Sequence, residues 1–241
     1  MSIALKTSAQ QKKLPPPPKF TDRSVWCDGT EFDDSINRRM LGVSYCQNLR
    51  AEHRKKLVII LTEEGDTIND YQYISLGLAE HDYRTMRIHH MPLMHYSDAR
   101  QLTAFTYADS LNSGAESIYA GIMANRNRVR YPAKDITLIG HGRYGDMCLM
   151  FAAKYPGMAA KVIALNSTNF PMPLSSIPKL YYIQAGDNDT PPGIIPTPAQ
   201  QKQYGITVAK IKCNAAHIGW QTRRHEQDEI IALLWELIRK P

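Results

Sequence analysis

The 241-residue sequence predicts an α/β protein, with a mostly parallel sheet as the middle layer of an α/β/α sandwich. Apolar runs of strand length alternate with amphipathic stretches of helical length, which favours a sheet covered by helices over a helical bundle or a β-sandwich. The length also suits one large domain with a full core. We expect the polar, proline-rich residues 1–20 to be a flexible tail and residues 21–241 to form a single domain.

The expected elements follow one another in a regular order. A weak hairpin is expected around 24–27 and 40–46, before strands at 57–61, 83–90, 136–139, 161–165, 180–184 and 207–212. Helices are expected at 70–80, 108–127, 143–155 and 223–239. The run at 57–61 (LVIIL) is apolar enough to be buried on both faces, which is typical of a central parallel strand. In the last helix we expect the buried residues to be Ile230, Leu233, Leu234 and Leu237.

Charge and composition exclude several classes of function. The net charge is +6, but the basic residues are spread over the chain without interleaved aromatic residues, so we expect no specific nucleic-acid binding. Neither a signal peptide nor a run of about 18 apolar residues is visible, so we expect a cytoplasmic protein without a membrane span. The partners to consider are a small apolar or acyl ligand and another protein.

The four cysteines are Cys27, Cys46, Cys148 and Cys213. They show no CxxC or Cys/His spacing, so we expect no zinc site, and no other metal or cofactor is indicated. Structural thiols are the simplest interpretation. Cys27 and Cys46 could lie on neighbouring strands and pair in an oxidising compartment, although nothing in the sequence requires it.

The segment at 136–156 combines an expected buried strand, a glycine-rich turn and a helix. The turn reads GHGRYG, with Gly140, Gly142 and Gly145 at positions where strand and helix can approach closely. This is the context that a nucleophile elbow, G-x-S-x-G, requires. A phosphate-binding loop has a similar outline, but this turn lies late in the chain and no Lys-Ser/Thr ending follows it.

Two later segments decide between these interpretations. AGDNDTPP follows the expected strand at 180–184, and NAAHIGW precedes the last expected helix. With GHGRYG, they resemble the elbow, acid and histidine of small lidless α/β-hydrolases, such as dienelactone hydrolases and simple carboxylesterases, over residues 57–239. The resemblance implies that Asp189, or alternatively Asp187, is the acid and that His217 is the base. The position of the nucleophilic serine falls on Gly142.

The resemblance also implies an oxyanion hole and a substrate pocket. One oxyanion donor would be the backbone N–H of Arg143, and the other would come from the segment TEEG, at Glu63, whose carboxylates would repel an oxyanion unless they turn outward. Aromatic and apolar residues could line the pocket: Tyr144, Phe170, Met172 and Trp220. His141 occupies a position of the elbow whose side chain normally packs against the sheet or neighbouring loops, and Cys148 is expected in the core.

Three functional hypotheses are compatible with these residues. In the first, the chain is a catalytically impaired hydrolase homologue that serves as a binding or interaction protein. In the second, His217 oriented by Asp189 acts as a general base without any nucleophile. In the third, the chain is a carboxylester or thioester hydrolase whose serine has been replaced. The altered TEEG segment favours the first over the third, because a single replacement would not explain it.

Overall fold

A computed structural model describes nine parts of the chain: residues 25–34, 39–48, 56–63, 71–90, 104–124, 131–167, 173–185, 195–211 and 224–241. Their strands are β1 (Val25–Asp34), β2 (Arg39–Asn48), β3 (Leu57–Glu63), β4 (Arg84–His90), β5 (Ile136–His141), β6 (Lys161–Leu165), β7 (Lys179–Ala185) and β8 (Thr207–Ile211). Their α-helices are α1 (Gln72–Glu80), α2 (Ala104–Ala124), α3 (Arg143–Lys154), α4 (Pro198–Tyr204) and α5 (Arg224–Arg239). Short 3-10 helices cover Ala133–Asp135 and Leu174–Ser176.

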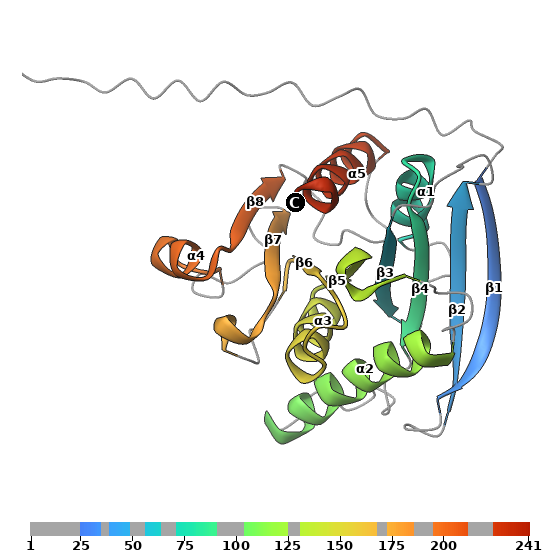
Figure 1. Cartoon of the computed structure of the whole chain (residues 1–241), viewed down its shortest axis with the longest axis horizontal. Coiled ribbons are helices and arrows are strands. Elements are labelled where there is room, and N and C mark those ends of the chain that lie inside the picture. Colours follow the sequence, from blue (N-terminus) through green and yellow to red (C-terminus); the bar gives the residue numbers. More distant parts are fainter. Residues whose placement is uncertain are drawn as a thin grey trace, which may run out of the picture.

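All the described strands belong to one sheet, in the order β1-β2-β4-β3-β5-β6-β7-β8. The six strands from β3 to β8 are parallel to one another, whereas β2 is antiparallel to both β1 and β4 (Figure 1). The parallel strands therefore all end at the same edge of the sheet, which we call the carboxyl edge. In α/β sheets this edge is where ligands usually bind.

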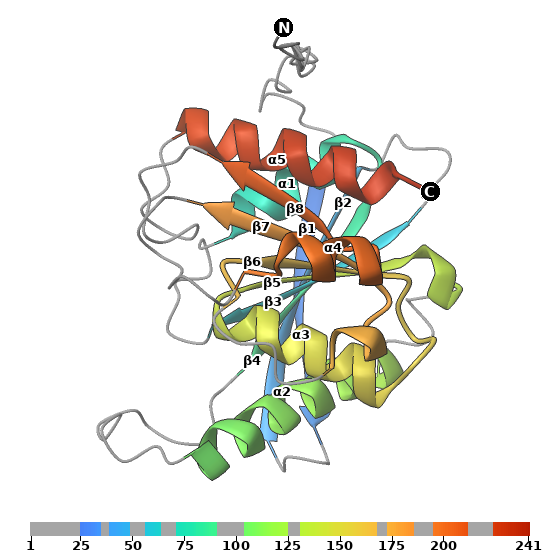
Figure 2. The ribbon, with the colours of Figure 1, turned by 90° about the vertical axis from the view of Figure 1, so that its left-hand side faces the viewer.

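Helices cover both faces of the sheet, and each face has its own core. α1 and α5 lie on one side, and α2 and α3 lie on the other (Figure 2). The residues of β3 alternate between the two cores: Leu57, Ile59 and Leu61 pack with α2 and α3, while Val58 and Ile60 pack with α1 and α5. All five are at most 2% exposed. The predicted three-layer sandwich and the doubly buried strand at 57–61 are both confirmed.

The expected elements are found, mostly with small shifts at their ends, and three details differ. The first strand of the hairpin is longer than expected, because β1 continues to Asp34 instead of ending near residue 27. α4 was not expected, because its sequence PAQQKQY has no apolar periodicity. Its beginning is fixed by a capping box in which the Thr197 side chain accepts from the backbone N–H of Gln200. In α5, Leu233 is only half-buried, contrary to expectation, and the buried face instead includes Ile231 and Ile238.

The cysteines differ in their chemical state. Cys46 is disulfide-bonded, and its Cα partner in the ladder between β1 and β2 is Cys27, so the expected placement on neighbouring strands is confirmed. Cys148 is a free thiol in the core, as expected, and Cys213 lies outside the described residues. Over the described part of the chain, none of the helices has the length and apolarity needed to cross a bilayer.

Lys161, at the start of β6, is buried beneath the carboxyl end of α5. Its ammonium group donates to the carbonyl oxygen of Ile238 at 2.7 Å and to that of Lys240. Cations at this position interact favourably with the negative end of a helix dipole. Burial nevertheless lowers the pKa of Lys161 from 10.5 to about 8, with smaller contributions from the charges of Lys56 and Lys179.

This lowered pKa predicts a pH dependence of stability. Between about pH 8 and pH 10.5 the unfolded chain keeps a proton on Lys161 that the folded chain has released. The free energy of unfolding therefore rises with pH in this window, and it rises less in Lys161→Met. Urea unfolding of the unaltered protein and of Lys161→Met, measured across this pH window, tests the prediction. The contributions of the other titrating groups cancel when the two free energies of unfolding are subtracted. A difference that does not change with pH would contradict it.

Candidate functional site

The turn between β5 and α3 places Gly142 at the carboxyl edge of the sheet. Gly142 has φ 54° and ψ −124°, a positive φ that side chains rarely tolerate. Its N–H donates to the carbonyl of Leu165 at 2.7 Å, and its carbonyl accepts from the N–H of Asp146 at 3.3 Å. The chain therefore reverses sharply from a buried strand into a helix, as the glycine pattern predicts.

The two glycines of GHG have opposite surroundings. A Cβ at Gly140 would lie closer than 3.0 Å to the carbonyl group of Tyr144 and 2.6 Å from the amide nitrogen of Gly145. A Cβ at Gly142 would have no atom of the described residues within 4 Å. Gly140 thus permits the close approach of β5 and α3, whereas the described part of the chain leaves room at Gly142.

His141, between these glycines, forms a hydrogen bond with Tyr71. The Tyr71 hydroxyl and His141 Nδ1 are 2.7 Å apart, and the ring centroids are 5.9 Å apart. Tyr71 precedes α1 and has φ 59°, so its backbone is also in the left-handed region. The pair joins the beginning of α1 to the elbow. Sequence reasoning missed it, because the two residues lie 70 positions apart and no local pattern connects them.

Asp146, in the first turn of α3, is a fully buried carboxylate with two hydroxyl donors. Tyr107 of α2 donates to Oδ2 at 2.5 Å, and Ser167, just after β6, donates to Oδ1. The Arg143 guanidinium carbon lies 5.3 Å from the centroid of the Tyr107 ring. These contacts tie α2 and β6 to the helix that follows Gly142. Buried charges with such hydrogen bonds hold their neighbours in a defined geometry.

Comparison with known proteins identifies the architecture. The sequence matches no protein-family model and no curated protein. Among solved structures, a dienelactone hydrolase-like promiscuous phosphotriesterase from metagenomic libraries matches with a TM-score of 0.66 and 11% identity, over 89% of this chain and 98% of that chain. The esterase Est22 matches with a TM-score of 0.60 and 9% identity, over 91% and 82%. A predicted CIB-like hydrolase from Thermoplasma acidophilum matches with a TM-score of 0.57 and 14% identity, over 88% and 99%.

The chain has an α/β-hydrolase fold. At these identities the likeness concerns the fold, since one fold can support many different activities. The hydrolase fold places the β5–α3 turn at the carboxyl edge, where Gly142 and Arg143 lie. Glu63, the expected second oxyanion residue, is the last residue of β3, the strand next to β5.

The other residues expected to act in this hydrolase fold are only partly described. Tyr144, expected to line a substrate pocket, is 6% exposed and packs in the core with α2. The others lie outside the described residues: Asp187, Asp189, His217, Phe170, Met172 and Trp220. The segments that carry Asp189 and His217 follow β7 and β8, which end at the same edge of the sheet as β5. Their roles therefore remain predictions.

Cys148 is not suited to act as a nucleophile in place of the serine that is expected at position 142. It is 1% exposed in the core, and burial, together with the charge of Asp146, raises the pKa of its thiol far above its ordinary value. The thiolate is the reactive form, so this thiol is chemically inert. Among the described residues, no group of three His, Cys, Asp or Glu side chains could hold a metal ion.

Proposed function

We propose that this chain is a binding or interaction protein built on the α/β-hydrolase fold, with glycine at the position of the serine nucleophile. The observation that carries the proposal is the backbone of Gly142, which has the strained, positive-φ conformation of an elbow and is not crowded by any of the described residues. Glycine has no side-chain atom that could attack an acyl carbon. The elbow geometry supports binding at this edge, without serine-type acyl transfer.

The ligand that we propose is a small apolar or acyl molecule, and a protein partner is the alternative. The structural neighbours include an esterase and a promiscuous phosphotriesterase, so carboxylesters and phosphotriesters are the first compounds to test. Their fold suggests that the ligand would bind at the carboxyl edge, next to Gly142.

The test measures the rate of hydrolysis of p-nitrophenyl acetate, p-nitrophenyl butyrate and a p-nitrophenyl phosphotriester. We expect no turnover above buffer for the unaltered protein and for the control Gly142→Ala. We also expect Gly142→Ser to stay within about tenfold of the buffer rate, because the carboxylates of the TEEG segment would repel an oxyanion at the expected second donor position. Binding of a non-hydrolysable acyl analogue, measured by calorimetry, should be saturable in the unaltered protein.

Other outcomes would overturn this proposal in recognisable ways. Robust turnover by Gly142→Ser that is abolished by adding His217→Ala would identify a hydrolase whose serine has been replaced. Turnover by the unaltered protein that disappears in His217→Ala would identify a general-base enzyme.

One contact in the structure supports the general-base alternative. The hydrogen bond between His141 and Tyr71 places a second histidine beside the elbow. Assay of His141→Gln in the unaltered background would show whether that histidine takes part.

A further inference from the structure

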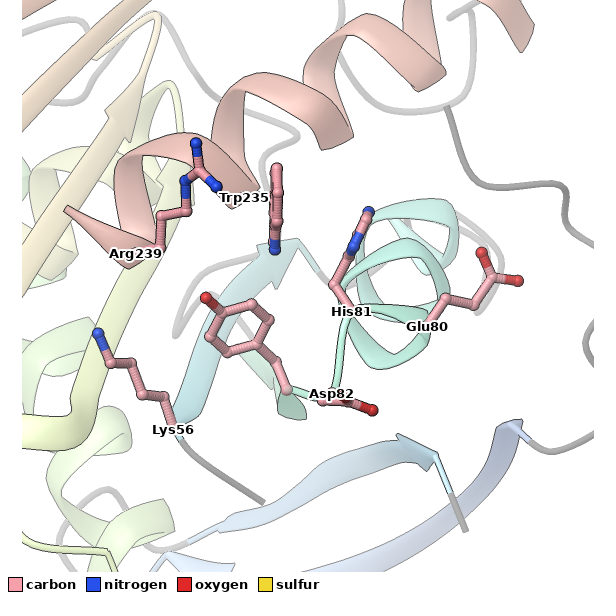
Figure 3. Close-up of a pocket in the computed structure, with 7 residues that line it drawn as sticks. Lys56, Glu80, His81, Asp82, Trp235 and Arg239 are labelled. Atoms are coloured by element: carbon pink, nitrogen blue, oxygen red, sulfur yellow. The ribbon is translucent and has the colours of Figure 1, made fainter. Parts of the chain in front are cut away.

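A cavity of about 430 Å³ lies at the amino ends of the parallel strands, opposite the edge that carries Gly142 (Figure 3). Its walls come from Lys56, which precedes β3, from the turn between α1 and β4, and from the last turns of α5. This volume is within the usual range for small-molecule sites. The cavity is separate from the elbow at Gly142, so its role is independent of the function proposed for that edge.

One wall is a stack of three side chains. The ring of His81 stacks on Trp235, with centroids 4.8 Å apart and an interplanar angle of 24°. The guanidinium carbon of Arg239 lies 4.2 Å from the Trp235 centroid. In Figure 3, His81 and Arg239 lie on opposite sides of the indole ring. Both faces of Trp235 are therefore covered, and a ligand would meet the edge of the ring, which carries the indole N–H donor.

The polar groups around this stack are mostly donors. Lys56 donates one hydrogen bond, to the carbonyl of Ile238 at 3.2 Å, and an ammonium group has two more N–H donors. Arg239 has no carboxylate partner among the described residues, although it contacts Trp235. Figure 3 shows the carboxylates of Glu80 and Asp82 directed away from Trp235 and Arg239. The lining is thus rich in donors on the side of Trp235 and Arg239, and its two carboxylates are directed away from that side.

The charged groups of the lining are separated within the cavity. Figure 3 shows Lys56 and Arg239 on one side and Glu80 and Asp82 on the other. Burial raises the pKa of Tyr83, although the charge of Arg239 acts in the opposite direction, so its hydroxyl stays a neutral donor. The charges of Lys56 and Lys179 both disfavour the protonated form of nearby Lys161. An anion in the cavity between Lys56 and Arg239 would be attracted by the charges of both side chains.

We infer that this cavity binds the oxyanion group of a small molecule, a phosphate or a carboxylate, through Arg239 and Lys56. Arginine presents a planar fork of donors that matches both groups, and lysine adds a point charge. The indole N–H of Trp235 and the hydroxyl of Tyr83 can donate to the remaining oxygens. All four groups line the one cavity.

The test is a titration with sodium phosphate and, separately, sodium acetate at constant ionic strength, followed by the ¹⁵N–¹H signal of the Trp235 indole. The chain has three tryptophans, so Trp235→Phe assigns the signal. We expect a saturable shift with at least one anion, weakened about tenfold or more in Arg239→Gln and less in Arg239→Lys. Lys202→Gln, which removes an exposed charge on α4, should bind like the unaltered protein.

Comparing the two titrations shows whether the natural ligand carries a phosphate or a carboxylate group. A shift with phosphate alone assigns a phosphate ligand, and a shift with acetate alone assigns a carboxylate. The inference is overturned if neither anion gives saturation, if Arg239→Gln binds as well as the unaltered protein, or if Lys202→Gln weakens binding equally. Should Arg239→Gln fail to fold by circular dichroism, Lys56→Gln takes its place with the same expectation.

Discussion

Replacing Gly140 with alanine is expected to destabilise the protein by at least about 3 kcal/mol, whereas Gly142→Ala should cost only about 1–2 kcal/mol. At Gly140 the new Cβ would meet backbone atoms of Tyr144 and Gly145, which cannot move aside without shifting α3. At Gly142 it would meet no atom of the described segments within 4 Å, so we expect only the strain of a positive φ.

Urea unfolding of the two variants and the unaltered protein measures this contrast. The two substitutions add the same methyl group two residues apart, so each is the matched control of the other. Equal losses of stability would contradict the separate roles given to the two glycines. The low cost at Gly142 also matters for the activity assay, because Gly142→Ser must fold if its lack of turnover is to be informative.

Asp146→Ala is expected to cost about 2–4 kcal/mol, because it removes the common acceptor of a buried serine hydroxyl and a half-buried tyrosine hydroxyl. Tyr107 and Ser167 both donate to this carboxylate, which has no exposure to solvent. Asp146→Asn keeps one acceptor oxygen and should cost about half as much. The free energy of unfolding at neutral pH gives both values.

The matched control is Asp109→Ala, which removes an exposed carboxylate on α2 and should change stability by less than about 0.5 kcal/mol. A double-mutant cycle with Tyr107→Phe isolates the bond between α2 and α3. If the two substitutions are additive, the hydrogen bond contributes nothing and the network has no structural role.

The sequence could predict the parts of the fold that depend on local pattern. The continuous apolar runs at 57–61 and 162–165 identify buried strands, because a parallel strand covered on both faces needs no polar side. The elbow is also visible locally, since strand, glycine turn and helix are consecutive. α4 was missed because its apolar content is low, although Thr197 and Gln200 already carried the capping signal.

What the sequence could not predict depends on contacts between distant segments. Tyr71 meets His141, and Trp235 stacks on His81, across intervals that no periodicity spans. The half-buried Leu233 shows the same limitation, because periodicity gives the buried face of a helix only approximately until its neighbours are known. The amino-edge cavity likewise forms only when β3, the α1–β4 turn and α5 come together.

The position of β3 has a consequence for how the chain folds. Leu57 pairs with Ile136, so α1, β4 and α2 all lie within the loop that this single pairing closes. Closing such a loop costs chain entropy before its contacts can compensate, and sheets built from long-range parallel pairs form slowly. The hairpin of β1 and β2, by contrast, joins neighbouring segments. The elbow at Gly142 follows β5 and so depends on this long-range pairing, and we expect the carboxyl edge of the sheet to be completed late in folding.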